Sequence, residues 1–228
     1  MCIRDSSKTL APFKSHRHLD TWERPQSCCK LQTNLTSICV LQIILGRISA
    51  YTEEFLSVDQ AGFRPGRSTC DQVLALSTFI ANSFQQNLKT GAVFVDLTAA
   101  YDAVWQAGLL VKLARSLRWW ATHTIEFLLR NRMFRAHIGD KVSRWRTQKN
   151  GLPQGSVLAP TLFNIYINDL PETTSRKFIY ADDICCATQA KTFKELERTL
   201  TSDMSVLSDY CAKWRLTPSV LKTVSSVF

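Results

Sequence analysis

The sequence predicts an α/β (α+β) fold in which a small antiparallel sheet is backed by helices. Three observations lead to this prediction. Ala92–Val95 is a short, continuous apolar run typical of a buried strand. Two further short strands, Lys177–Tyr180 and Ile184–Ala187, flank the tight turn that contains Ala181, Asp182 and Asp183. Apolar residues also recur at helical spacing in several segments, most clearly over Lys194–Trp214.

The first part of the chain is the least regular. Residues 1–45 show no sustained periodicity, whereas Ile44, Ile48, Tyr51 and Phe55 predict a short amphipathic helix that starts near Ile43. We therefore divide the chain into a poorly assigned segment, 1–45, and a core, 46–228. A frameshift in the first segment is one hypothesis for its irregular composition.

A loop punctuated by Gly62, Pro65 and Gly66 follows, and Ser68 or Thr69 is expected to cap the next helix, Asp71–Asn87. We expect this helix to turn one apolar side into the core, at Val73, Leu76, Phe79, Ile80 and Phe84.

The elements that follow the predicted strand Ala92–Val95 alternate in type. They begin with a helix over Gln106–Arg130, a hairpin that pairs Met133–Ile138 with Val142–Arg146, and a loop over Asn150–Gly155. An apolar helix from Val157 to Ile167 follows this loop. After the two short strands come the helix Lys194–Trp214 and a last strand over Val224–Phe228, and we expect the helix to turn its apolar residues inward, namely Leu196, Leu200, Met204, Leu207, Tyr210 and Cys211.

Composition narrows the class of protein. The chain has 228 residues, of which 45% are hydrophobic and 21% charged, as in ordinary globular proteins. The net charge of +9 is typical of chains that meet nucleic acid or anionic membranes. No apolar run approaches the roughly 20 residues of a membrane span. The 8 cysteines form no C-x-x-C pair, so we expect reduced, mostly buried thiols in an intracellular protein.

The basic residues are concentrated in one segment. Ala107–Asn150 contains ten Lys or Arg residues against Glu126 and Asp140, with Trp119, Trp120, Phe127, Phe134 and Trp145 interleaved. Such a segment suits a phosphate backbone and stacking bases. The alternative is a solvated surface with aromatics in the core, and the sequence leaves both interpretations open.

Three aspartates are candidates for catalysis. Asp96 follows a buried strand, and Asp182 and Asp183 lie at the tip of a predicted hairpin. Carboxylates on neighbouring strands can hold two Mg²⁺ ions about 3.5–4 Å apart. The alternative is that Asp182 and Asp183 merely fill a turn.

Four sequence motifs favour the metal-binding interpretation of these aspartates over the turn-filling one. They are Gln60-Ala61-Gly62-Phe63-Arg64-Pro65-Gly66, Ala92-Val93-Phe94-Val95-Asp96 with Tyr101-Asp102, Gly151-Leu152-Pro153-Gln154-Gly155-Ser156, and Tyr180-Ala181-Asp182-Asp183. In this order they resemble the motifs of reverse transcriptases encoded by non-LTR (LINE-type) retrotransposons. The resemblance implies the fingers and palm of a polymerase right hand, without a thumb, and RNA-directed DNA polymerase activity.

The resemblance also assigns roles to single residues. Asp96, Asp182 and Asp183 would be the catalytic metal ligands for two Mg²⁺ ions, with Mn²⁺ as a substitute. Tyr101, Gln154, Arg64 and Lys222 would contact the incoming nucleotide, and Arg67 and Gly155 would contact nucleic acid. Tyr101 would exclude a ribose 2′-hydroxyl, and Lys222 would serve the pyrophosphate leaving group. The implied partners are an RNA template, a DNA primer and dNTPs, with cytoplasmic synthesis and nuclear action.

The resemblance is incomplete near the start, where Arg24-Pro25 alone remains of a longer family segment. We also expect the chain to stop before the thumb. An RNA-dependent RNA polymerase is disfavoured, because it would favour Gly-Asp-Asp at the hairpin and would not want Tyr101 to block ribonucleotides. The alternative that stays open is an inactive, truncated remnant of a retroelement that acts at most as a nucleic-acid-binding module.

Overall fold

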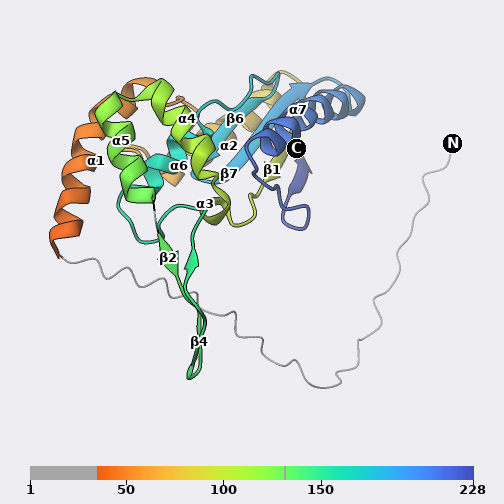
Figure 1. Ribbon diagram of the computed structural model, residues 1–228. Helices are drawn as coiled ribbons and strands as arrows, with labels where there is room; N and C mark the ends of the chain where they lie inside the picture. Colours follow the sequence, from red (N-terminus) through yellow and green to blue (C-terminus); the bar gives the residue numbers. More distant parts are fainter. Residues whose placement is uncertain (1–34, 131) are drawn as a thin grey trace, which may run out of the picture.

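A four-stranded antiparallel sheet forms the centre of the fold. The computed structural model describes residues 35–130 and 132–228 (Figure 1). The sheet contains β1 (Lys89–Val95), β6 (Arg176–Tyr180), β7 (Asp183–Ala190) and β8 (Val224–Val227) in the order β6-β7-β1-β8. Every neighbouring pair is antiparallel. The predicted α+β fold is confirmed, with each of these strands within three residues of its predicted bounds.

Both faces of the sheet are covered, because successive side chains of a strand point to opposite faces. Val93, Val95 and Cys186 point into the main hydrophobic core. The helices α6 (Ala159–Ile167) and α7 (Phe193–Lys213) contribute to this core. On the other face, a smaller cluster around Phe178 and Cys185 packs against α2 (Thr69–Gln85).

The helix α2 is capped as the sequence predicts. The hydroxyl of Ser68 accepts a hydrogen bond from the Asp71 backbone N–H, and the Asp71 carboxylate accepts one from the Ser68 N–H. The expected inward side is only partly correct. Leu76 and Phe79 pack against the sheet. Val73 and Phe84 are each 61% exposed, because α2 covers only part of the sheet and contacts mainly β6 and β1.

Two helix boundaries differ from the prediction. The helix α1 spans Leu35–Phe55 and so begins eight residues before Ile43, because residues 35–43 contain no proline or glycine. The rest of the segment 1–45, residues 1–34, lies outside the described residues.

The predicted helix over Gln106–Arg130 is two helices, α4 (Gln106–Ser116) and α5 (Trp119–Leu129). Leu117 and Arg118 between them have extended backbone conformations. This break lets α5 fold back on α4, so that Leu113 and Ile125 are buried in the same core. A straight helix of this length would carry its second half away from that core.

A narrow β-ribbon projects from the body of the molecule (Figure 1). It consists of β2 (Met133–Phe134), β3 (His137–Ile138), β4 (Lys141–Val142) and β5 (Arg146–Thr147). β2 pairs with β5 and β3 pairs with β4, so the predicted hairpin around Gly139 is confirmed with an interruption between the two pairs.

Two further expectations concern helices and thiols. Among the described residues, no helix combines the length and the apolarity that crossing a membrane would require. Five of the cysteines are described, and all five are free thiols. Cys185, Cys186 and Cys211 are buried, whereas Cys39 and Cys70 are exposed.

Candidate active site

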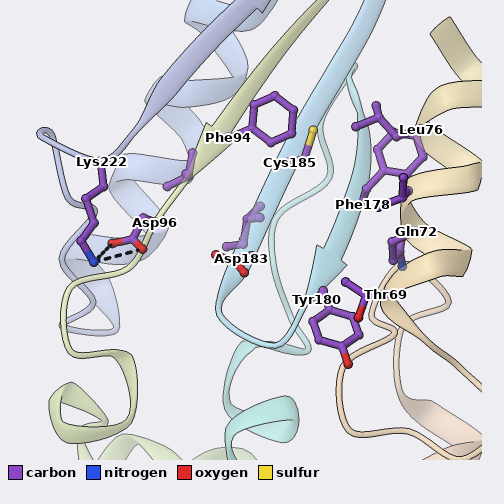
Figure 2. Close-up of a pocket in the computed structure, with 13 residues that line it drawn as sticks. Thr69, Gln72, Leu76, Phe94, Asp96, Phe178, Tyr180, Asp183, Cys185 and Lys222 are labelled. Carbon is purple, nitrogen blue, oxygen red and sulfur yellow. Dashed lines mark hydrogen bonds and ion pairs between the residues drawn. The ribbon is translucent and has the colours of Figure 1, made fainter.

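The sheet brings the three predicted aspartates to one end of the fold. Asp96 directly follows β1, and its neighbour Val95 pairs with Ile184 of β7. Asp183 begins β7 and pairs with Tyr180, so Ala181 and Asp182 form the two-residue turn of the β6–β7 hairpin. Ala181 has a φ of 56°, in the left-handed region that such turns need. Figure 2 shows Asp96 and Asp183 at the ends of adjacent strands.

The electrostatics of this end of the sheet favour a cation. Desolvation raises the pKa of Asp183, the negative charges of Asp182 and Asp96 raise it further, and Lys222 acts in the opposite direction. The Oδ2 atom of Asp96 is buried and accepts no hydrogen bond. The Lys222 ammonium lies 3.3 Å from this atom, as the dashed lines of Figure 2 show.

The donor set fits divalent metal ions. No three acidic, histidine or cysteine side chains within residues 35–130 and 132–228 form a complete coordination group by themselves. Mg²⁺ typically takes one or two carboxylates, and substrate phosphates and water supply its other oxygen ligands. The Oδ2 of Asp96 accepts no hydrogen bond, and the neighbouring carboxylates repel Asp183, so a bound cation would stabilise this group of carboxylates.

Tyr101 lies beside the aspartates. Its ring stacks on Phe163 of α6, with centroids 4.8 Å apart and an interplanar angle of 20°. Burial raises the pKa of Tyr101 to about 12, with a further contribution from the charge of Asp182. Its hydroxyl is buried without a hydrogen-bond partner. The stacking on Phe163 fixes this ring, and the charge of Asp182 acts on its hydroxyl.

Hydrogen bonds to Tyr101 and Asp102 hold the Gly151–Gly155 loop in place. The N–H of Leu152 donates to the carbonyl of Tyr101 at 2.8 Å. Gln154 is exposed, and its amide donates to Asp102 Oδ1 at 2.9 Å. Gly151 has a φ of 84°, and a Cβ there would lie 2.9 Å from the Asp102 carbonyl oxygen. Gly155 also has a positive φ, of 80°, and open space around it.

The sequence did not predict the contacts by which Gln60 holds the β6–β7 hairpin in place, which we call the Gln60 brace. The Oε1 of the buried Gln60 accepts the N–H of Ala181 at 2.8 Å, and its Nε2 donates to the Ala181 carbonyl at 3.1 Å. The same Oε1 also accepts the N–H of Gly62 at 2.8 Å. One side chain thus fixes the strained residue next to Asp182. No local pattern in the sequence marks Gln60 for this role, because its partner Ala181 lies 121 positions away.

Gly62 and Asn164 complete this brace. A Cβ on Gly62 would lie 2.2 Å from the Ala181 nitrogen, so only glycine allows this approach. The Asn164 amide of α6 donates to the Gly62 carbonyl at 2.8 Å. These contacts tie the first motif to the Tyr-x-Asp-Asp hairpin.

Arg64 and Arg67, which were expected to face nucleotide and nucleic acid, differ in their exposure. The Arg64 side chain is 4% exposed and forms an ion pair with Glu53 at 2.9 Å. It also donates to the carbonyls of Ser57 and Gln60. We therefore correct its expected role, since its guanidinium holds the loop from inside. Arg67 is half-buried and donates to the Val58 carbonyl, which leaves part of its guanidinium accessible.

A cavity of about 350 Å³ opens beside the carboxylates (Figure 2). Leu76, Phe94 and Phe178 line its apolar part, and Asp96, Asp183 and Lys222 lie at its polar end. The site is therefore a recess between α2 and the ends of β1 and β7.

Comparisons with known proteins agree with this geometry. The family described as "Reverse transcriptase (RNA-dependent DNA polymerase)" matches residues 23–226. The probable RNA-directed DNA polymerase from transposon BS of Drosophila melanogaster is 32% identical over 234 residues, which cover 97% of this chain and 26% of that protein. The RNA-directed DNA polymerase from mobile element jockey of Drosophila funebris is 27% identical, over 82% of this chain and 22% of that protein. The chain thus spans about a quarter of the length of these relatives.

Solved structures resemble the fold. The apo telomerase of Candida tropicalis, truncated from its C-terminal domain, has a TM-score of 0.55 and 16% identity, over 83% of this chain and 40% of that chain. The telomerase of the same organism with a fragment of telomeric RNA has a TM-score of 0.57 and 15% identity, over 86% of this chain and 34% of that chain. At these identities the likeness establishes the fold alone.

Proposed function

The chain belongs to the reverse transcriptase (RNA-dependent DNA polymerase) family, and from this premise we propose that it is the catalytic part of an RNA-directed DNA polymerase of a non-LTR retrotransposon. The reaction is the transfer of a deoxynucleotide from a dNTP to the 3′-hydroxyl of a DNA primer paired with an RNA template. The relatives from transposon BS and mobile element jockey support this assignment.

The observation that carries the proposal is the convergence of Asp96, Asp182 and Asp183 on adjacent strand ends, with Tyr101 beside them. A hairpin that served only as a turn would not need a buried glutamine to fix its strained residue, nor a third carboxylate across the next strand. Carboxylates grouped in this way suit phosphoryl transfer, in which positioning and charge neutralisation supply most of the catalysis.

Members of this family generally use divalent metal ions, and we propose two Mg²⁺ ions, replaceable by Mn²⁺, at this site. Bound there, the ions would lower the pKa of the primer hydroxyl and neutralise the triphosphate. Asp96 and Asp182 would be the principal ligands, and Asp183 a supporting one. Lys222 lies on the Asp96 side of the site, where its ammonium would meet the negative charge of the leaving pyrophosphate.

Tyr101 and Gln154 would act on the incoming nucleotide. The stacked ring of Tyr101 would occupy the space that a ribose 2′-hydroxyl requires. The exposed amide of Gln154, oriented by Asp102, would contact the nucleotide from the Gly151–Gly155 loop. The positive φ of Gly155 would let the nucleic-acid backbone approach this loop closely.

Primer extension tests the proposal. The purified chain is given a DNA primer on an RNA template, dNTPs and Mg²⁺, beside an Asp182→Ala, Asp183→Ala double variant. We expect extension by the wild-type chain and none by the variant. A wild-type chain that binds primer–template but extends nothing, also with Mn²⁺, would favour the alternative of a nucleic-acid-binding module without activity.

A further inference from the structure

The β-ribbon of β2–β5 carries most of the unpaired positive charge of the segment from Ala107 to Asn150. Residues 132–149 hold six Lys or Arg residues and a single acidic residue, Asp140. Arg135, Lys141, Arg144, Arg146 and Lys149 are all exposed. Within the described residues, none of these five side chains forms an ion pair with a carboxylate.

Most of the basic residues on and beside α4 and α5 contact other residues of the fold. Lys112 is buried and pairs with Asp169, and Arg130 pairs with Glu126. The guanidinium of Arg118 lies 5.6 Å from the ring centroid of Tyr51. The two interpretations of the basic segment thus apply to different parts of it. Lys112, Arg118 and Arg130 contact other residues of the fold, whereas Arg115 and the five exposed ribbon residues present their charge to solvent.

The ribbon also presents apolar and aromatic surface. Trp145 is 56% exposed, and the Arg135 guanidinium lies 4.8 Å from the centroid of its ring. Met133, Ile138 and Val142 are 56%, 67% and 48% exposed. An exposed aromatic ring among basic side chains that form no ion pair is the combination with which proteins bind the bases and phosphates of one strand together.

The base of the ribbon adjoins the candidate active site. The Gln148 N–H donates to the Arg132 carbonyl at 2.7 Å and closes the ribbon. Two residues later the chain enters the Gly151–Gly155 loop, where the Gly151 N–H donates to the Val104 carbonyl at 2.8 Å. A strand held along the ribbon would therefore lead toward Tyr101 and the aspartates.

We propose that the ribbon is an arm that binds a single nucleic-acid strand outside the active site, with Arg144, Arg146 and Lys141 on its phosphates and Trp145 stacked on a base. The inference rests on the proposed function only for the source of the strand, which would be the unpaired part of the template. A duplex fits less well, because its bases are already stacked and an A-form major groove is too narrow to admit side chains.

Binding is measured by fluorescence anisotropy with labelled 20-nucleotide single strands, one RNA and one DNA, in EDTA and without dNTPs. Two triple variants are compared. Lys141→Ala, Arg144→Ala, Arg146→Ala changes the ribbon, and Lys191→Ala, Lys194→Ala, Arg198→Ala removes the same charge from exposed positions near the start of α7. Comparing the RNA strand with the DNA strand shows whether the ribbon prefers RNA or binds single strands of either kind.

The ribbon variant should bind the single strand more weakly, and the slope of log affinity against log salt should be smaller by about two, since each phosphate contact to a single strand contributes about 0.7. The α7 variant should match the wild type. Trp145→Ala should lower affinity about five- to hundredfold without changing the salt slope. Equal losses in both triple variants, or no effect of Trp145→Ala, would overturn the proposal.

The same proteins separate this inference from the proposed function. If the wild-type chain extends no primer but its single-strand binding depends on the ribbon, the polymerase proposal fails and the arm remains. If it extends a short, fully paired primer–template and the ribbon variant binds single strands as well as the wild type, the arm is refuted and the polymerase proposal stands.

Discussion

The ammonium of Lys222 lies 3.3 Å from Oδ2 and 3.5 Å from Oδ1 of Asp96, so a lysine neutralises the carboxylate that ends β1. Oδ2 has no hydrogen-bond donor of its own. A cation that binds Asp96 would therefore compete with this ammonium for the carboxylate.

Replacing Lys222 should therefore strengthen metal binding in the absence of nucleotide. For Lys222→Met we expect Mg²⁺ or Mn²⁺ to bind about two- to fivefold more tightly, because an exposed ion pair of this kind is worth about 0.5–1 kcal/mol. Isothermal titration calorimetry of the nucleotide-free chain measures this. Extension should become slower in the same variant, since the charge that meets the pyrophosphate is lost.

Lys194→Met is the matched control, because Lys194 is exposed near the start of α7 and forms no ion pair with Asp96, Asp182 or Asp183. Its metal affinity should equal that of the wild type. Unchanged affinity in Lys222→Met would show that the ion pair does not compete with metal.

The Gln60 brace gives a second prediction. Gln60→Met keeps the length of the side chain but leaves the N–H and carbonyl of Ala181 and the N–H of Gly62 without their partner. We expect the free energy of unfolding to fall by about 2–4 kcal/mol, as measured by urea denaturation. The extension rate of the folded variant should fall at least about tenfold, because Asp182 loses its fixed position. Gln85→Met, on the exposed end of α2, should change neither quantity.

Gly62 and Gly46 offer a comparison of the same substitution in two places. A Cβ at Gly62 would lie 2.2 Å from the Ala181 nitrogen, whereas nothing lies within 4 Å of a Cβ at Gly46 in α1. Gly62→Ala should displace the hairpin and lower both the melting temperature and the extension rate. Gly46→Ala should raise stability by about 0.5–1 kcal/mol, because glycine is unfavourable inside a helix. Equal melting temperatures for the two variants would contradict the close packing at Gly62.

The sheet and the positions of Asp96, Asp182 and Asp183 at its strand ends were predictable from the sequence because local signals specify them. Ala92–Val95 is a short apolar run, and the Tyr180–Asp183 motif combines a strand end with a turn. The helix α7 was predictable for the same reason, since its periodic apolar residues all face the core.

The features that the sequence did not predict depend on contacts between distant segments. Gln60 and Ala181 are 121 positions apart, and no local pattern distinguishes this glutamine from an exposed one. The role of Arg64 was missed because its carboxylate partner, Glu53, lies on the preceding helix. The break at Leu117 and Arg118 has no proline or glycine to announce it and follows from the packing of α5 on α4.

Lys112 predicts a dependence of stability on pH. Its ammonium is buried and donates to Asp169, to the Tyr166 carbonyl and to the Tyr210 hydroxyl, 3.6 Å from the centroid of the Trp214 ring. Burial lowers the pKa of Lys112 from 10.5 to about 8, although Asp169 opposes this shift and Lys213 and Arg115 add to it. Between about pH 8 and 10.5 the unfolded chain therefore holds a proton that the folded chain has released.

The contribution of Lys112 to the free energy of unfolding should therefore rise with pH in that window, by at most about 1.4 kcal/mol per pH unit. Buried thiols act in the opposite direction above pH 9, because burial raises the pKa of Cys185 to about 12 and that of Cys211 to about 11. The measurement is thus the difference between the wild type and Lys112→Met in urea denaturation from pH 7 to pH 10. A difference that does not change with pH would contradict the lowered pKa.

Tyr101 should govern the choice between dNTPs and ribonucleotides. Its ring is fixed by stacking on Phe163, so it cannot easily turn away from a ribose 2′-hydroxyl. Tyr101→Ala should reduce the preference for dNTPs at least about tenfold, measured as the ratio of kcat/KM for a dNTP and the matching ribonucleotide. The variant also loses the packing of the ring, but a ratio measured on one protein is independent of the fraction that is folded. Tyr101→Phe retains the ring and should keep the preference. It should also be at least as stable as the wild type, because the Tyr101 hydroxyl is buried without a partner. If Tyr101→Phe lost the preference as fully as Tyr101→Ala, discrimination would depend on the hydroxyl and not on the bulk of the ring.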